Sequence, residues 1–109
     1  MEQWLIEIQP ESFEPEVLKC SKPALVTFLK KGVASGDMLI AVLKRFAHES
    51  KSGVAFFKID VEQCSEIATR YRISKIPMTL VFIKGKVAAH FFGVVSAQKV
   101  KNTIEAALR

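Results

Sequence analysis

The side chains in this sequence with the most reactive chemistry are two cysteines, Cys20 and Cys64, and two histidines, His48 and His90. A thiol can attack a disulfide or bind a metal ion, and an imidazole can transfer protons. Two cysteines so far apart are too few for a disulfide framework or a four-ligand zinc site. We therefore expect two free thiols, no metal site and no other cofactor.

The two cysteines differ in their expected surroundings. Cys20 lies near the end of the first predicted helix, and we interpret it as a structural thiol. Cys64 lies at the start of a later helix, where the helix dipole lowers the pKa of an exposed thiol. Nothing basic adjoins Cys64 in the sequence, so an inert thiol is favoured and a reactive one is the alternative. Neither His48 nor His90 has a nucleophile beside it.

The segment 28–43, FLKKGVASGDMLIAVL, reads as an apolar strand that turns sharply into an amphipathic helix. Active sites are often built at such turns, because helix-terminal N–H groups and the helix dipole point into them. The turn has no nucleophile stronger than Ser35. We interpret Ser35 as a helix cap, since no general base is recognisable nearby. The turn therefore resembles a catalytic site that lacks its catalyst.

The pattern of apolar residues predicts the order β-α-β-α-β-α-β-β-α. The continuous apolar run Ala24–Leu29 is typical of a central strand covered on both faces. Helix starts are expected at Ser12, at Ser35 or Asp37, and at Ser96. Further strands are expected at 4–8, 54–59, 78–83 and 87–92, and a short helix before Tyr71. The fold class is α/β, a mixed sheet of about five strands with about four helices on both faces.

Composition excludes several classes of protein. The 109 residues, half of them hydrophobic, are enough for one domain over 1–109 with a real core. No apolar run is long enough to cross a membrane, and Met1–Trp4 has no signal-peptide character, so a cytoplasmic protein is expected. The net charge is +5. Because the basic residues are spread along the chain without a binding motif, nucleic-acid binding is not expected.

Three motifs resemble the thioredoxin family, and the resemblance covers nearly the whole chain. A strand ends in Ile59-Asp60-Val61-Glu62 before a short helix, and Lys84-Gly85-Lys86 forms a hairpin ahead of Gly93. Between them, Ile73-Ser74-Lys75-Ile76-Pro77 matches the site where thioredoxins place a cis-proline that faces the active site. The resemblance implies a thioredoxin fold with a cis peptide bond before Pro77.

The same resemblance implies that the family's dithiol chemistry is missing at its usual place. The family signature is Trp-Cys-Gly-Pro-Cys, and residues 32–36 of this chain read Gly-Val-Ala-Ser-Gly. Val33 stands for the attacking cysteine and Gly36 for the resolving one, whereas thiol–disulfide exchange needs a thiolate attacker and a second thiol to release the mixed disulfide. Thr27 also stands where thioredoxins commonly bury an aspartate. We therefore expect the turn to keep its shape without its reaction.

The function expected from these residues is a non-redox binding module, such as an adaptor, chaperone or assembly subunit, and not an enzyme. The alternative is a thiol redox protein that uses Cys64 in monothiol or glutathione mixed-disulfide chemistry. A third interpretation is a stable subunit of a larger complex. Lys31 and Lys75 on the rim hint at an acidic partner segment. An extended peptide would add as a strand in a groove that the resemblance builds from Gly32, Val33, Ala34, Ile76, Pro77, Phe92, Gly93 and Val94.

Overall fold

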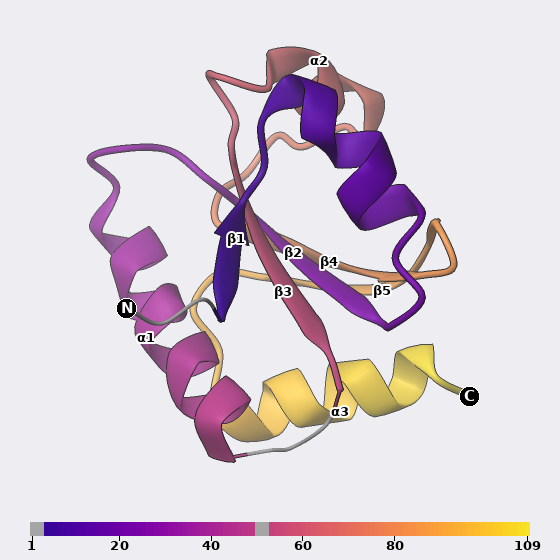
Figure 1. Ribbon diagram of the computed structural model, residues 1–109. Coiled ribbons are helices and arrows are strands. Elements are labelled where there is room, and N and C mark those ends of the chain that lie inside the picture. Colours follow the sequence, from indigo (N-terminus) through magenta and orange to yellow (C-terminus); the bar gives the residue numbers. More distant parts are fainter. Residues whose placement is uncertain (1–3, 50–52) are drawn as a thin grey trace.

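The five strands form one mixed sheet with the order β1-β3-β2-β4-β5 (Figure 1). The structure is a computed structural model and describes residues 4–49 and 53–109. Strands β1, β3 and β2 are mutually parallel, and β4 and β5 extend the sheet with antiparallel pairs. The expected mixed α/β architecture is therefore confirmed. The strand bounds are β1 Leu5–Glu7, β2 Ala24–Leu29, β3 Ala55–Asp60, β4 Met78–Ile83 and β5 Lys86–Phe92.

Helices cover both faces of the sheet (Figure 1). Helices α1, Ala34–Glu49, and α3, Ala97–Ala107, lie on one face. The other face carries α2, Ser65–Arg70, and an N-terminal helical segment. Each face has its own apolar cluster, and β2 contributes Leu25 to one and Phe28 to the other. Burial on both faces explains why the central strand is a continuous apolar run rather than an alternating one.

The first expected helix is replaced by two shorter turns. A 3₁₀ turn, η1, spans Pro10–Ser12, and a π-helical turn, η2, spans Glu14–Leu18. Ser12 does not cap a following helix. Its hydroxyl accepts a hydrogen bond from the Gln9 N–H at 2.9 Å and donates one back to the Gln9 carbonyl. Pro15 has no N–H to donate to the preceding turn, so a regular α-helix cannot run through this segment.

The remaining helix starts agree with the sequence to different degrees. Ser96 caps α3 as expected, since its hydroxyl accepts a hydrogen bond from the Lys99 N–H at 3.1 Å. Helix α1 begins at Ala34, so Ser35 and Asp37 lie inside its first turn and neither is the cap. Asp37 still places a negative charge at the positive end of the helix dipole. The cap was predicted wrongly here because Ser35 and Asp37 are both residue types that are common at helix starts, and the sequence does not show which residue begins the helix.

Within residues 4–49 and 53–109, no helix is both long and apolar enough to cross a membrane. The expectation about a signal peptide concerned Met1–Trp4, of which Met1, Glu2 and Gln3 lie outside the described residues. Strands β2 and β4 have the bounds that the sequence predicted. Strand β3 begins and ends one residue later than expected, and β5 begins one residue earlier.

Candidate functional site

The turn between β2 and α1 keeps the geometry of a catalytic loop. Gly32 adopts φ +85°, a conformation that residues with a Cβ rarely adopt. The Gly36 N–H donates to the Val33 carbonyl with 3.0 Å between N and O, which closes the first turn of α1. Val33 is half-buried just before the helix, and Gly36 is buried within it. Neither position supplies a polar side chain.

The peptide bond between Ile76 and Pro77 is cis, as the resemblance implied. Phe28 of β2 pairs with Met78 of β4, so the turn after β2 and the cis-proline lie at the same end of neighbouring strands. The Gly93 N–H donates to the Pro77 carbonyl with 2.9 Å between N and O. The three segments expected to form a groove therefore meet at the end of the sheet where β2 finishes and β4 begins.

The expected groove residues differ in exposure. The exposed ones are Gly32, Ala34, Phe92 and Val94, the half-buried ones are Val33, Ile76 and Gly93, and Pro77 is buried. Both rim lysines are exposed, but they face different surroundings. Lys75 places its ammonium 5.7 Å from the centre of the Phe92 ring, and Lys31 lines a cavity on the other side of the turn.

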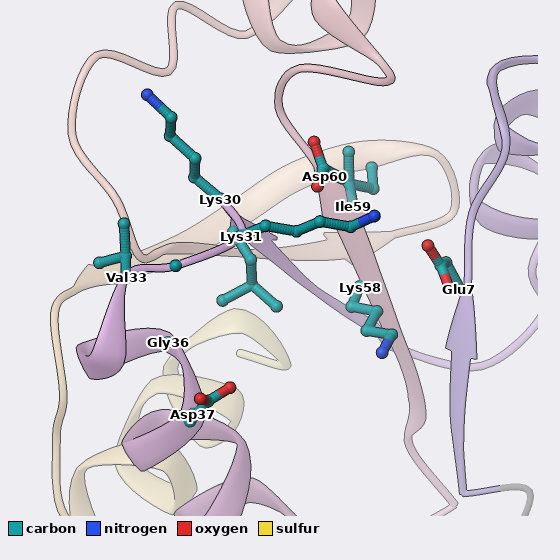
Figure 2. Close-up of a pocket in the computed structure, with 11 residues that line it drawn as sticks. Glu7, Lys30, Lys31, Val33, Gly36, Asp37, Lys58, Ile59 and Asp60 are labelled. Carbon is teal, nitrogen blue, oxygen red and sulfur yellow. The ribbon is translucent and has the colours of Figure 1, made fainter.

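That cavity, of about 170 Å³, lies where the carboxyl ends of β1, β2 and β3 meet (Figure 2). In Figure 2, Lys31 extends toward the strands and Lys30 extends away from them. The Lys30 ammonium lies 4.0 Å from a carboxylate oxygen of Glu62. Charges of both signs line the cavity, which therefore has no dominant sign. Its lining includes Glu7, Leu29, Lys30, Lys31, Gly32, Val33, Gly36, Asp37, Lys58, Ile59 and Asp60.

Sequence reasoning did not connect Glu7 and Lys58 with this edge. The available signal was topological, because carboxyl ends of parallel strands converge at one side of a sheet. Glu7 and Lys58 occupy partner positions on β1 and β3, and Lys58 also pairs with Thr27 of β2. Once the parallel order of these strands is known, the side chains of Glu7 and Lys58 can be placed beside the turn.

A neutral hydroxyl pair occupies the place of the family's buried aspartate. Thr27 and Thr79 are both fully buried, and their hydroxyl oxygens lie 3.0 Å apart. Thr79 of β4 is the partner residue in register with Thr27, and sequence reasoning did not identify it. Among the described residues, no buried side-chain nitrogen or oxygen lacks a hydrogen-bond partner. The interior at this point is therefore satisfied without a charge.

Cys64 precedes α2 and is 2% exposed. Its Sγ lies 3.5 Å from the Ile8 carbonyl oxygen, to which the thiol donates a hydrogen bond. Burial raises the pKa of this thiol, and the negative charges of Asp60, Glu11 and Glu7 raise it further. The expectation that the helix dipole lowers this pKa required an exposed sulfur. It is corrected by the burial of Sγ at the start of a helix of only six residues.

Cys20 follows η2 and is half-buried. Its N–H donates to the Val17 carbonyl with 3.3 Å between N and O, and its side chain packs against the same apolar cluster as Cys64. Cys20 lies close before Ala24, at the amino end of β2, whereas Cys64 follows the carboxyl end of β3. Since β2 and β3 are parallel, the two cysteines lie at opposite ends of these strands.

No group of three or more histidine, cysteine, aspartate or glutamate side chains suited to a metal ion occurs in the described part of the chain. Both cysteines are free thiols. These two thiols are nucleophiles that the chain itself supplies.

A mixed five-stranded sheet with helices on both faces and a cis-proline beside the first α-helix defines a thioredoxin-like α/β protein. The family model for thioredoxin matches residues 4–106. The chain is 30% identical to thioredoxin C-2 of Corynebacterium nephridii over 105 residues, which cover 96% of this chain and 97% of that protein. It is 31% identical to the thioredoxin of Griffithsia pacifica over 98 residues, or 90% of each chain. The chain belongs to the thioredoxin family.

These relatives correct the function expected from the sequence. We expected a non-redox adaptor, chaperone or assembly subunit that is not an enzyme. This expectation is contradicted, because the matched proteins are named thioredoxins and are matched over almost their whole length. The expectation had rested on Val33 and Gly36. Loss of that cysteine pair removes the dithiol route but leaves two other thiols in the chain. The alternative, a thiol redox protein, agrees better with the relatives.

Proposed function

We propose that this chain is a thiol redox protein in which Cys64 exchanges with disulfides by a monothiol route. Its relationship to the thioredoxins over residues 4–106 carries the proposal. The positions of the family's cysteine pair hold no sulfur, so the exchanging thiol must be Cys64 or Cys20. The position of Cys64 beyond β3 supports its choice, because Asp60 at the end of β3 lines the cavity beside the turn.

In this reaction the Cys64 thiolate attacks one sulfur of a protein disulfide. A mixed disulfide forms, the original S–S bond breaks, and the released thiolate takes a proton from solvent. A glutathione thiolate then attacks the Cys64 sulfur and frees the second substrate thiol. A further glutathione thiolate releases Cys64 and forms glutathione disulfide. Two glutathione thiols are oxidised for each protein disulfide reduced.

Burial of the thiol sets the conditions of this chemistry. The attacking species is the thiolate, and the raised pKa of Cys64 keeps it protonated at neutral pH. A disulfide can reach Sγ only after the contact with Ile8 opens. We therefore expect exchange to be slow at neutral pH and to accelerate as the pH rises.

We propose that protein substrates lie in the groove around the turn and the cis-proline. Extended backbone there would pair by strand addition. The exposed surfaces of Gly32, Ala34, Phe92 and Val94 support this placement. Two free cysteines also support a reducing compartment such as the cytoplasm, where thiols remain unpaired.

The direct test is the site of mixed-disulfide formation with glutathione disulfide. The wild-type protein, Cys64→Ser and Cys20→Ser would be incubated at several pH values and mapped by peptide mass spectrometry. We expect an adduct on Cys64 in the wild type and in Cys20→Ser, and we expect it to form faster as the pH rises. Cys20 is half-buried and therefore more accessible, so an adduct confined to Cys20 would contradict the assignment. Absence of any adduct would contradict the function itself.

A further inference from the structure

The acidic residues of this chain are distributed unevenly, although the basic ones are spread throughout. Between Glu66 and Glu105 the sequence has seven lysines and arginines and no aspartate or glutamate. This segment forms β4, β5 and most of α3. Two of these cations, Lys75 and Lys99, line one hollow beside β5, the last strand in the sheet order.

Strand β5 is the outer edge of that side (Figure 1). Its inner edge pairs with β4, and among residues 4–49 and 53–109 no strand pairs with its outer edge. Most of its seven residues are exposed, and Phe91 is the buried one. A long exposed edge offers a row of backbone N–H and C=O groups to another chain.

Exposed apolar side chains accompany this edge. Phe92 is 50% exposed and Val87 is 43% exposed. Phe92 and His90 project to the same side of the sheet, because they are two residues apart in one strand. Beside them, a hollow of about 340 Å³ is lined by Lys75, Met78, His90, Phe91, Phe92, Val95 and Lys99. The hollow thus has an apolar floor and two ammonium groups, one from Lys75, which precedes β5 in the sequence, and one from Lys99, which follows it.

We propose that β5 docks an extended acidic segment of a protein partner, which adds to the sheet as a sixth strand. Its backbone pairs with the outer edge of β5, an apolar side chain contacts Phe92, and its carboxylates lie near Lys75 and Lys99. This surface shares Phe92 and Lys75 with the proposed substrate groove, but strand addition along β5 does not depend on the thiol chemistry. The two lysines favour acidic side chains in the partner, and the unpaired edge of β5 favours an extended backbone.

A peptide fits this edge better than a nucleic acid does. A sugar-phosphate backbone has no N–H groups and cannot form a ladder with a strand. Surfaces that bind single-stranded nucleic acid present several large aromatic rings for stacking, whereas the exposed rings that line the hollow are those of Phe92 and His90. The edge therefore favours a chain that can add as a strand.

The test uses a fluorescent peptide of about eight residues in which glutamate and valine alternate, a length typical of strands. Binding is measured by fluorescence anisotropy to a Cys20→Ser/Cys64→Ser background, which removes thiol exchange. Two peptides serve as probes of mechanism: one in which proline replaces valine at equal charge, and one in which lysine replaces glutamate. Proline at every second position removes half of the peptide's N–H groups and fixes φ, which disfavours pairing with a strand.

We expect the Glu-Val peptide to bind and both altered peptides to bind at least about tenfold more weakly. Lys75→Glu/Lys99→Glu should weaken binding by a similar factor. The matched control, Lys19→Glu/Lys22→Glu, reverses two exposed lysines that precede β2 and should leave binding unchanged. Amide NMR signals should shift along Lys86–Phe92.

Three results would overturn the proposal. Equal binding of the proline peptide would exclude strand addition, and an equal loss in the control variant would reduce the effect to net charge. Oligothymidylate that binds more tightly than the Glu-Val peptide at the same salt concentration would make the surface a nucleic-acid site. Because the background variant has no cysteine, none of these results bears on the thiol function.

Discussion

The Cys64 thiol donates a hydrogen bond to the backbone carbonyl of Ile8, with 3.5 Å between sulfur and oxygen. Both residues are almost fully buried, and the contact joins the chain just beyond β1 to the start of α2. The thiol is thus held in the apolar cluster beneath the N-terminal helical segment. Any reaction of this sulfur begins with the loss of that contact.

Cys64 should be alkylated much more slowly than Cys20 in the folded protein. Its sulfur is buried and its pKa is raised, so both access and thiolate fraction are low. We expect a difference of at least about tenfold with iodoacetamide at neutral pH, and nearly equal rates in concentrated urea. Peptide mass spectrometry would follow both sites. Equal native rates would show that the sulfur is accessible without opening.

The free energy of unfolding should fall as the pH rises through about 9, the ordinary pKa of this thiol. The folded state keeps the Cys64 proton at pH values where the unfolded chain has lost it. This contribution to stability is therefore complete below the unfolded pKa and is lost above it. The expected slope is at most about 1.4 kcal/mol per pH unit. Urea unfolding from pH 7 to 10 would measure it.

Cys64→Ala is the control for that measurement, because the other titrating groups remain. Its free energy of unfolding should decline less steeply with pH than that of the wild type. Parallel curves for the two proteins would contradict the raised pKa.

Val33→Cys/Gly36→Cys should create a dithiol reductase if the turn keeps its catalytic shape. A Cβ at Gly36 would lie 3.0 Å from Cδ2 of Leu29, the flexible end of a side chain that can shift. We expect insulin disulfide reduction at least about tenfold faster than in the wild type. Val33→Cys alone lacks a resolving thiol and is the control. No gain in the double variant would mean that the turn has changed its geometry.

The Thr27–Thr79 pair should behave as a unit. Thr27→Val leaves the buried Thr79 hydroxyl unpaired, which should cost about 1–3 kcal/mol. Thr27→Val/Thr79→Val removes both hydroxyls and should cost less than either single variant. Urea unfolding of the three variants would test this. A double variant whose cost equals the sum of the single variants would show that the two hydroxyls act independently.

The sheet could be predicted from the sequence because its signals are local. The apolar runs at Ala24–Leu29 and Met78–Ile83 gave correct bounds, and Ser96 capped its helix as expected. The cis peptide bond before Pro77 followed from the family resemblance. The irregular turns at Pro10–Leu18 were not predicted. A cap-like serine and two prolines suggested the start of an α-helix, but Pro15 lacks the N–H that a regular helix through this segment needs.

The candidate site could be predicted only in part. The residues of the turn and the cis-proline were identified, but their roles depended on contacts from distant strands. The burial of Cys64 against Ile8 and the pairing of Thr27 with Thr79 both join segments more than fifty residues apart. The missing catalytic pair was visible in the sequence. That absence concerns only the turn at residues 32–36. The inference that the whole chain lacks redox activity was wrong because it left the other two cysteines out of account.

The central claim is that the chain reduces disulfides through Cys64. The most direct measurement is glutathione-coupled reduction of a protein disulfide by the wild type, Cys64→Ser and Cys20→Ser, with glutathione reductase and NADPH as the electron supply. We predict turnover in the wild type and Cys20→Ser that rises with pH, and background rates in Cys64→Ser. Turnover that survives in Cys64→Ser, or none in the wild type at any pH, would contradict the claim.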